Sequence, residues 1–258
     1  MELSSKEIQE ILSNWNIGHL LNYSKVEKGE VNHNWIVETK RGKFVLRKIS
    51  KYKQVKDLNF EFSYLNNLKN KGFPYRIPTP VLTIHKKHYM SYKNSMFWLY
   101  TFIEGKIKEN FRRKAIVQVA KMMAQYHKII ESTKLYNGKP KADDMMKNVV
   151  TKELRLFQKR ILKAKIKKPF EKIFMKESDI LMSILKRLDI KEYSKLKKYP
   201  LHRDLNPENL LWKDQKLFGI LDFDNVSQIN DSFIKDLGIV IQYACSKGHK
   251  INIKKAKF

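Results

Sequence analysis

The first hundred residues alternate between helical and strand-like patterns of apolar positions. Over 4–14 apolar residues recur at three- and four-residue steps behind a cap at Ser4, which predicts a short amphipathic helix. Two apolar runs, 35–37 and 44–46, flank the turn signal Lys-Arg-Gly-Lys at 40–43. This arrangement predicts a β-hairpin.

Helical periodicity dominates the rest of the chain. One helical face extends over 55–71, and two strands follow, the second over 96–103. A further helix is expected over 115–130, and the lysine-rich stretch 143–198 suggests several packed helices. The run 201–226 has strand, loop and strand character.

The change from strands to helices falls near Glu104 and Gly105. The pattern predicts an α+β protein with a lobe boundary at this point. We expect two lobes: a small antiparallel sheet with a helix in residues 1–104, and a mainly helical lobe in residues 105–258.

Composition narrows the class of protein. A hydrophobic content of 42% is typical of a globular chain, and no segment approaches the ~20 apolar residues that span a bilayer. The first residues lack the apolar core of a signal peptide, so we expect a cytoplasmic protein. The net charge of +27 would attract phosphates, nucleic acid or anionic lipid, although a general lysine bias would produce it too.

The segment 202–211 carries the sharpest chemical signal. It reads His-Arg-Asp-Leu-Asn-Pro-Glu-Asn-Leu-Leu and matches the catalytic loop H-R-D-x-x-x-x-N of kinases. In that loop the aspartate accepts the proton of the attacking hydroxyl, and the asparagine binds magnesium. The match predicts Asp204 as the catalytic base and Asn209 as a metal ligand.

A second motif follows at 219–224, which reads Gly-Ile-Leu-Asp-Phe-Asp. Its apolar strand ends in Asp222, at the place where kinases have their second magnesium ligand. Alone, the first motif could be a capped turn and the second an ordinary strand-ending acid. Their occurrence together in this order favours phosphoryl transfer.

With these motifs the chain resembles the aminoglycoside phosphotransferase and choline kinase superfamily of small-molecule kinases. The second motif has Asp-Phe-Asp where protein kinases have Asp-Phe-Gly, and no Ala-Pro-Glu follows. The helix 115–130 and the triplet 236–238, Asp-Leu-Gly, are similar to further family segments. The resemblance covers most of the chain and implies a two-lobed, protein-kinase-like fold that uses ATP and Mg²⁺.

The resemblance also implies which residues bind the phosphates of the nucleotide. The family pattern puts the phosphate-pairing cation at Arg47, with Glu61 as its expected ion-pair partner. Lys48 is the alternative cation, and strand alternation places the two side chains on opposite faces of the sheet.

Two backbone segments complete the implied nucleotide site. The loop that contains Gly29, Asn32 and Asn34 would cover the phosphates with backbone N–H groups. Backbone groups near Thr101 and Ile103 would bind adenine at the hinge between the lobes.

The expected function is transfer of the ATP γ-phosphoryl group to a hydroxyl of a small molecule. The family usually continues into C-terminal helices that line the acceptor pocket, whereas this chain ends at Phe258, and the acceptor is left open. The positive charge favours a neutral or anionic acceptor over a polycationic one. Arg203, where the family commonly has glycine, keeps a protein kinase as an alternative, and a basic nucleic-acid-associated module with weak activity is another.

Overall fold

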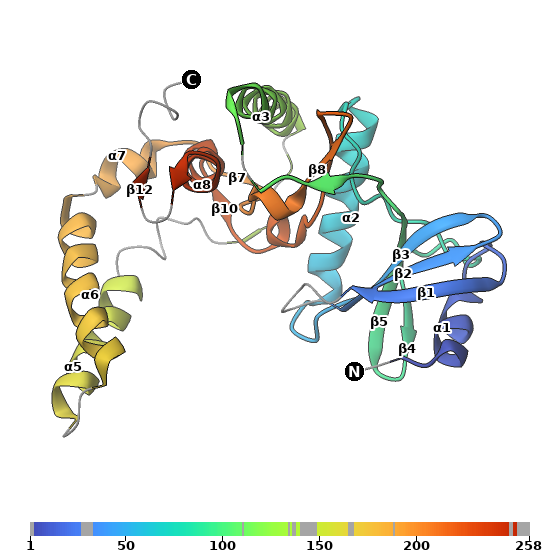
Figure 1. Cartoon of the computed structure of the whole chain (residues 1–258), viewed down its shortest axis with the longest axis horizontal. Coiled ribbons are helices and arrows are strands. Elements are labelled where there is room, and N and C mark those ends of the chain that lie inside the picture. The colour runs from blue at the N-terminus through green and yellow to red at the C-terminus, as the bar shows by residue number, and fades with distance from the viewer. Residues whose placement is uncertain are drawn as a thin grey trace.

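In the computed structural model the sheet lies at one end of an elongated molecule and a helical hairpin at the other, with residues 201–226 between them (Figure 1). The residues that the structure describes are 3–26, 33–109, 111–133, 135, 138–139, 149–164, 168–187, 189–247 and 250–251.

The N-terminal sheet has five antiparallel strands in the order β1-β2-β3-β5-β4. The predicted hairpin over 35–46 forms its centre, and the turn 40–43 falls between the two strands as expected. The strands are β1 (Leu20–Val26), β2 (His33–Thr39), β3 (Gly42–Lys48), β4 (Met90–Tyr92) and β5 (Ser95–Thr101).

Each face of this sheet is covered by one helix. Helix α1 (Ser5–Leu12) packs on the outer face with Trp35 and Leu46, and its predicted cap at Ser4 is present as a capping box. Helix α2 (Val55–Asn70) packs on the inner face with Val45. Because side chains alternate across a strand, neighbouring residues of β3 enter different cores.

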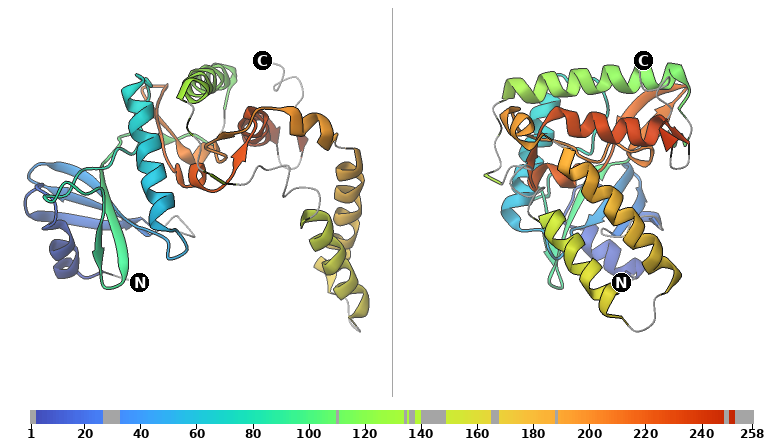
Figure 2. Two further views of the ribbon diagram at one scale, coloured as in Figure 1. Left: turned by 180° about the vertical axis from the view of Figure 1, so that it is seen from behind. Right: turned by 90° about the vertical axis from the view of Figure 1, so that its left-hand side faces the viewer.

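The C-terminal part is mainly helical and contains small sheets. Helix α3 packs against the three-stranded sheet β6-β8-β9, and the motif at 202–211 runs into β8 while the motif at 219–224 begins at the end of β9 (Figure 2). No described helix has the length and apolar character needed to cross a bilayer. The elements are α3 (Arg113–Thr133), α7 (Ile190–Lys195), α8 (Phe233–Ala244), β6 (Lys106–Ile107), β7 (Tyr199–Pro200), β8 (Leu210–Lys213), β9 (Lys216–Ile220), β10 (Asn230–Asp231), β11 (Ser246–Lys247), β12 (Lys250–Ile251), and the 3₁₀ helices η2 (Pro207–Asn209) and η3 (Asp224–Ser227).

Helices α5 (Thr151–Lys163) and α6 (Pro169–Arg187) form a hairpin that projects from the body. They contact each other through Phe157 and Phe174, whose ring centroids are 6.1 Å apart. No residue of α5 is buried, and Ser178 is the one buried residue of α6. In the described part of 143–198, α5 and α6 therefore pack on each other, while Tyr193, in the helix at 190–195, contacts the body by a hydrogen bond to Asp231.

A backbone contact joins the loop after α2 to strand β9. The N–H of Arg76 donates to the carbonyl of Phe218 at 2.9 Å, and the carbonyl of Arg76 accepts from Ile220 at 2.9 Å. Gly219, between them, has no room for a side chain: an added Cβ would lie 2.8 Å from Ile103 Cγ2. The two halves of the molecule are thus joined here as well as through the chain at 101–105.

Candidate active site

The carboxylate of Asp204 is held in place by two side-chain amides of its own loop. Asn206 Nδ2 donates to Asp204 Oδ1 at 2.7 Å, and Asn209 Nδ2 donates to Asp204 Oδ2 at 2.9 Å. Asn206 also caps η2, because its Oδ1 accepts from the N–H of Glu208 at 2.8 Å. The loop therefore fixes the direction of the carboxylate while leaving it half-exposed.

Backbone bonds bring the two predicted metal ligands, Asn209 and Asp222, to neighbouring positions. The N–H of Leu221 donates to the carbonyl of Asn209 at 2.9 Å. The buried ring of His202 adds a second link: Nε2 lies 2.8 Å from the Leu221 carbonyl, and Nδ1 accepts from the N–H of Asp204. These bonds are compatible with the tautomer protonated at Nε2.

Two residues of the site have left-handed backbone conformations that non-glycine residues seldom adopt. Arg203 has φ = +57° and Asp222 has φ = +59°. Fully buried Asp236 stabilises the first, since its Oδ1 accepts from the Arg203 N–H at 2.8 Å. Its Oδ2 lies 3.0 Å from His127 Nε2.

The donor atoms at this site fit magnesium. Asn209 Oδ1 and Asp222 Oδ2 accept no hydrogen bond from the described residues, and 40% of the Asp222 side chain is exposed. The part of the chain that is described has no group of three or more His, Cys, Asp or Glu side chains placed to bind a metal. Magnesium commonly takes only one or two protein oxygens and keeps water and phosphate oxygens as its other ligands.

Arg47, and not Lys48, faces the catalytic segment. Arg47 is 5% exposed, and its Nη2 lies 3.1 Å from Asp222 Oδ1 and 2.6 Å from Asp224 Oδ2. Burial lowers the pKa of the guanidinium, but Asp224 and Asp222 outweigh this effect and raise it above its usual value. The alternation along β3 thus gives the expected side for Arg47.

The expected ion pair between Arg47 and Glu61 is not formed. Glu61 is 1% exposed and pairs instead with Lys53, whose Nζ also lies 3.0 Å from Asp224 Oδ1. Burial raises the pKa of Glu61 to about 7, although the Lys53 ammonium acts in the opposite direction. The predicted ion pair was wrong because Arg47 Nη2 binds the two aspartates and Lys53 binds Glu61.

The structure describes only one of the three residues expected in the phosphate-covering loop. Gly29 and Asn32 lie outside the described residues. Asn34 belongs to β2 and stands directly opposite Arg47, so the two side chains share a face of the sheet. Its Oδ1 is buried and has no hydrogen-bond partner among the described residues.

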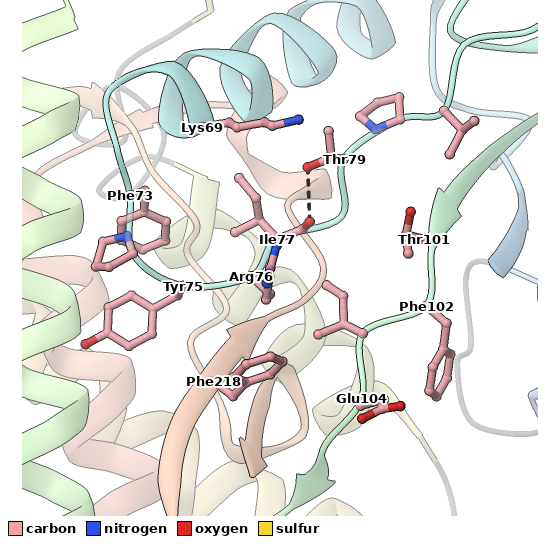
Figure 3. A pocket seen from close by; sticks show the side chains of 14 residues that line it. Lys69, Phe73, Tyr75, Arg76, Ile77, Thr79, Thr101, Phe102, Glu104 and Phe218 are labelled. Carbon is pink, nitrogen blue, oxygen red and sulfur yellow. Dashed lines mark hydrogen bonds between the residues drawn. The ribbon is translucent and has the colours of Figure 1, made fainter. Parts of the chain in front are cut away.

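Strand β5 ends at Thr101, and Ile103 follows in the segment that joins the sheet to the C-terminal part; their role in adenine binding stays a prediction. A cavity of about 890 Å³ opens between this hinge segment and residues 73–81 (Figure 3). Neither Arg47 nor Asp222 lines it. We therefore do not identify this cavity with the catalytic site, which lies where β3 faces the two motifs.

Sequence reasoning missed three side chains that shape the site. Lys53 and Asp224 belong to the ion network, and Asn206 orients Asp204. Asn206 had a signal in the sequence, because Asn followed by Pro is typical of the start of a helical turn. Lys53 had none, since it lies in a turn with another lysine, Lys51.

Comparison with known sequences identifies the family. The phosphotransferase enzyme family matches residues 22–248. A homoserine kinase of Nitrobacter winogradskyi is 25% identical over 99% of this chain and 74% of its own length. A homoserine kinase of Bradyrhizobium sp. (strain ORS 278) is 24% identical, with the same coverage of both chains.

Solved structures confirm the two-lobed, kinase-like α+β fold. A spectinomycin phosphotransferase in complex with ADP and spectinomycin aligns with a TM-score of 0.75 at 16% identity, over 100% of this chain and 78% of that one. A phosphotransferase in complex with GDP and kanamycin aligns with a TM-score of 0.65 at 16% identity, over 98% and 82% of the two chains. The match over 22–248 supports a kinase that acts on a hydroxyl. It shows that the chain belongs to the phosphotransferase enzyme family.

Proposed function

We propose that the chain transfers the γ-phosphoryl group of ATP, with Mg²⁺, to the hydroxyl of a small acceptor that is neutral or anionic overall. The observation that carries this proposal is the arrangement of Asp204, Asn209 and Asp222. A fixed, half-exposed carboxylate stands beside an amide oxygen and a second carboxylate that have free acceptor positions. Positioning of this kind supplies most of the catalysis in phosphoryl transfer.

Each side chain has a defined task in this reaction. Asp204 orients the acceptor hydroxyl and takes its proton, and Asn206 and Asn209 keep its carboxylate in the required direction. Asn209 and Asp222 would hold Mg²⁺, which neutralises charge on the phosphates. Arg47 supplies a permanent positive charge on the phosphate side of the site.

The two lobes have different roles in the proposed reaction. We assign nucleotide binding to residues 1–104, with adenine bound by backbone groups near Thr101 and Ile103 and the phosphates covered by the segment of Gly29, Asn32 and Asn34. Residues 105–258 carry the catalytic loop and acceptor binding. Arg47 lies at the contact between the lobes, which supports this division.

Homoserine is the first acceptor to test. The two relatives compared above are homoserine kinases, and homoserine carries no net charge at neutral pH. A protein acceptor is less compatible with the structure. Between Asp222 and Asp236 the chain forms only η3 and β10 before α8 begins, which leaves little chain for a peptide-binding platform.

The test is ATP consumption by the purified chain with Mg²⁺ and L-homoserine, other small hydroxyl compounds, aminoglycosides or generic protein substrates. We expect turnover with a neutral or anionic small molecule and none without Mg²⁺. Asp204→Ala serves as the matched inactive variant. Turnover that survives this substitution, or that occurs only with protein substrates, would contradict the proposal.

A further inference from the structure

One cation beside the site has no role in the reaction described so far. Lys53 lies in the turn between β3 and α2, and only 11% of its side chain is exposed. Its ammonium bridges two carboxylates from distant parts of the chain, Glu61 on α2 and Asp224 at the start of η3. Lys53 thus links the helix of the first lobe to the segment that immediately follows Asp222.

Arg47 and Lys53 share Asp224 between them. Arg47 Nη2 binds Asp224 Oδ2 at 2.6 Å, and Lys53 Nζ binds Asp224 Oδ1 at 3.0 Å. Both carboxylate oxygens are therefore fixed, and Asp224 stands two residues after Asp222 in the same turn. A change in the position of Asp224 must be transmitted to Asp222, whose left-handed backbone already restricts it.

The charges of this group explain why a second cation is required. Arg47 and Lys53 face three carboxylates, and the Glu61 side chain is 2% exposed. A buried carboxylate needs a charged or hydrogen-bonding partner, and Arg47 is already engaged by the two aspartates. Without Lys53, Glu61 would be buried without its ion-pair partner, and the link from Glu61 to Asp224 would be lost.

We propose that Lys53 is a positioning residue: by pairing with Glu61 and Asp224 it holds α2 and the turn 222–227 in register, a task that Arg47, engaged by Asp222 and Asp224, does not perform. The sequence pattern predicted that Arg47 would both pair with Glu61 on α2 and bind the phosphates. In the structure Lys53, and not Arg47, pairs with Glu61. The catalytic consequence rests on the function proposed above, whereas the link between α2 and the turn does not.

The experiment compares Lys53→Met with Lys51→Met in the full chain. Lys51 is exposed and lies over the ring of Tyr52, 5.1 Å from its centroid, so it is a lysine of the same turn outside the network. Hydrogen–deuterium exchange is measured over 55–61 and 222–227 without nucleotide. Exchange should increase in both segments for Lys53→Met and in neither for Lys51→Met. Unchanged exchange in both segments would overturn the proposal.

ATP consumption with L-homoserine and Mg²⁺ is measured on the same proteins. Lys53→Met should be slowed by at least about tenfold, and Lys53→Arg, which keeps the charge, should retain most activity. The double variant Lys53→Met with Glu61→Gln removes both charges. It should stay as slow as Lys53→Met, because the contact between residue 53 and Asp224 is still missing. Recovery to within about twofold of wild type would show that Lys53 only neutralises Glu61, and would refute its positioning role.

A wild-type chain that consumes no ATP with any acceptor, and binds no Mg·ATP in calorimetry, would refute the proposed function. The exchange comparison would still decide whether Lys53 joins the two segments. The two failures are therefore distinguishable.

Discussion

At the scale of single residues, the groups proposed to carry out the chemistry differ in burial from the groups that hold the loop in place. Asp204 is half-exposed, and its carboxylate accepts hydrogen bonds from Asn206 and Asn209 of its own loop. Asp236, by contrast, is fully buried and holds the backbone of the loop. Substitution of Asp204 should affect the rate of the reaction, and substitution of Asp236 should also affect folding.

Asp204→Ala and Asp222→Asn should each abolish phosphoryl transfer while leaving the protein folded. Loss of the base alone should slow turnover by about 10²–10⁴-fold. Turnover and the thermal unfolding midpoint are measured together. Asp214→Asn, an exposed acid in the turn between β8 and β9, is the control and should behave as wild type. Near wild-type turnover in either site variant would show that the assignment is wrong.

Asn209→Ala should raise the magnesium concentration needed for half-maximal turnover and also lower the maximal rate. The first effect follows from loss of a metal ligand, and the second from loss of the hydrogen bond to Asp204 Oδ2. A magnesium titration of the purified variant separates the two effects. A midpoint identical to that of wild type would count against Asn209 as a ligand.

Sequence patterns predicted which candidate residues the structure brings together, but not the ion pairs around them. The two motifs gave Asp204, Asn209 and Asp222, because spacing within a short loop determines what their side chains can reach. Nothing in the sequence distinguishes Lys53 from Lys51, since the difference arises only when α2 brings Glu61 alongside one of them. Long-range ion pairs of this kind depend on tertiary packing, which local patterns do not contain.

At the scale of secondary structure, elements with a clear turn or cap were predicted well. The hairpin β2–β3, helix α1 and helix α2 lie where the pattern placed them. The apolar periodicity predicted that α5 and α6 are helices, but it did not predict that both are largely exposed. Periodicity reports which side of a helix is apolar, but not whether another element covers it.

The contact between the loop after α2 and β9 predicts a large difference between two glycine substitutions. Gly219→Ala should destabilise the fold by about 1–3 kcal/mol, because the new Cβ would lie 2.8 Å from Ile103 Cγ2. Gly238→Ala, inside α8 with no atom within 4 Å of the new Cβ, should stabilise it by about 0.5–1 kcal/mol. Chemical denaturation of both variants measures the difference. Equal effects would contradict the close packing at Gly219.

Helix α1 gives a prediction for pH. The backbone N–H of Ser4, followed by Lys93, lowers the pKa of Glu7 to about 2 from a usual value of 4.5. A lowered carboxyl pKa stabilises the fold fully above pH 4.5, and the contribution is lost as the pH falls towards 2. Glu7→Gln should therefore lower the unfolding midpoint at pH 7, and its difference from wild type should shrink between pH 4.5 and 2. A difference that is constant with pH would exclude this cause.

At the scale of the whole molecule, the charge of +27 bears on the choice of acceptor. Like charges at 4 Å repel by about 4 kcal/mol at an effective dielectric of 20, and salt screens the longer-range part over roughly 8 Å. Kanamycin and neomycin should therefore be poor substrates beside a neutral hydroxyl compound. Steady-state kinetics at physiological salt test this. Efficient phosphorylation of either aminoglycoside at micromolar KM would contradict it.

The backbone pairing of Arg76 with β9 restricts how the molecule can open. The backbone joins the lobes at two places, through the chain at 101–105 and through the bonds of Arg76 to Phe218 and Ile220. Helix α2 adds buried contacts, because Tyr64 Oη lies 2.5 Å from Tyr126 Oη and donates to the carbonyl of Pro200 at 2.8 Å. Hinge bending about the two backbone connections would pull Tyr64 away from Tyr126 and Pro200. Opening of the lobes therefore has to break the side-chain contacts of α2 as well as the ion pair between Arg47 and Asp222.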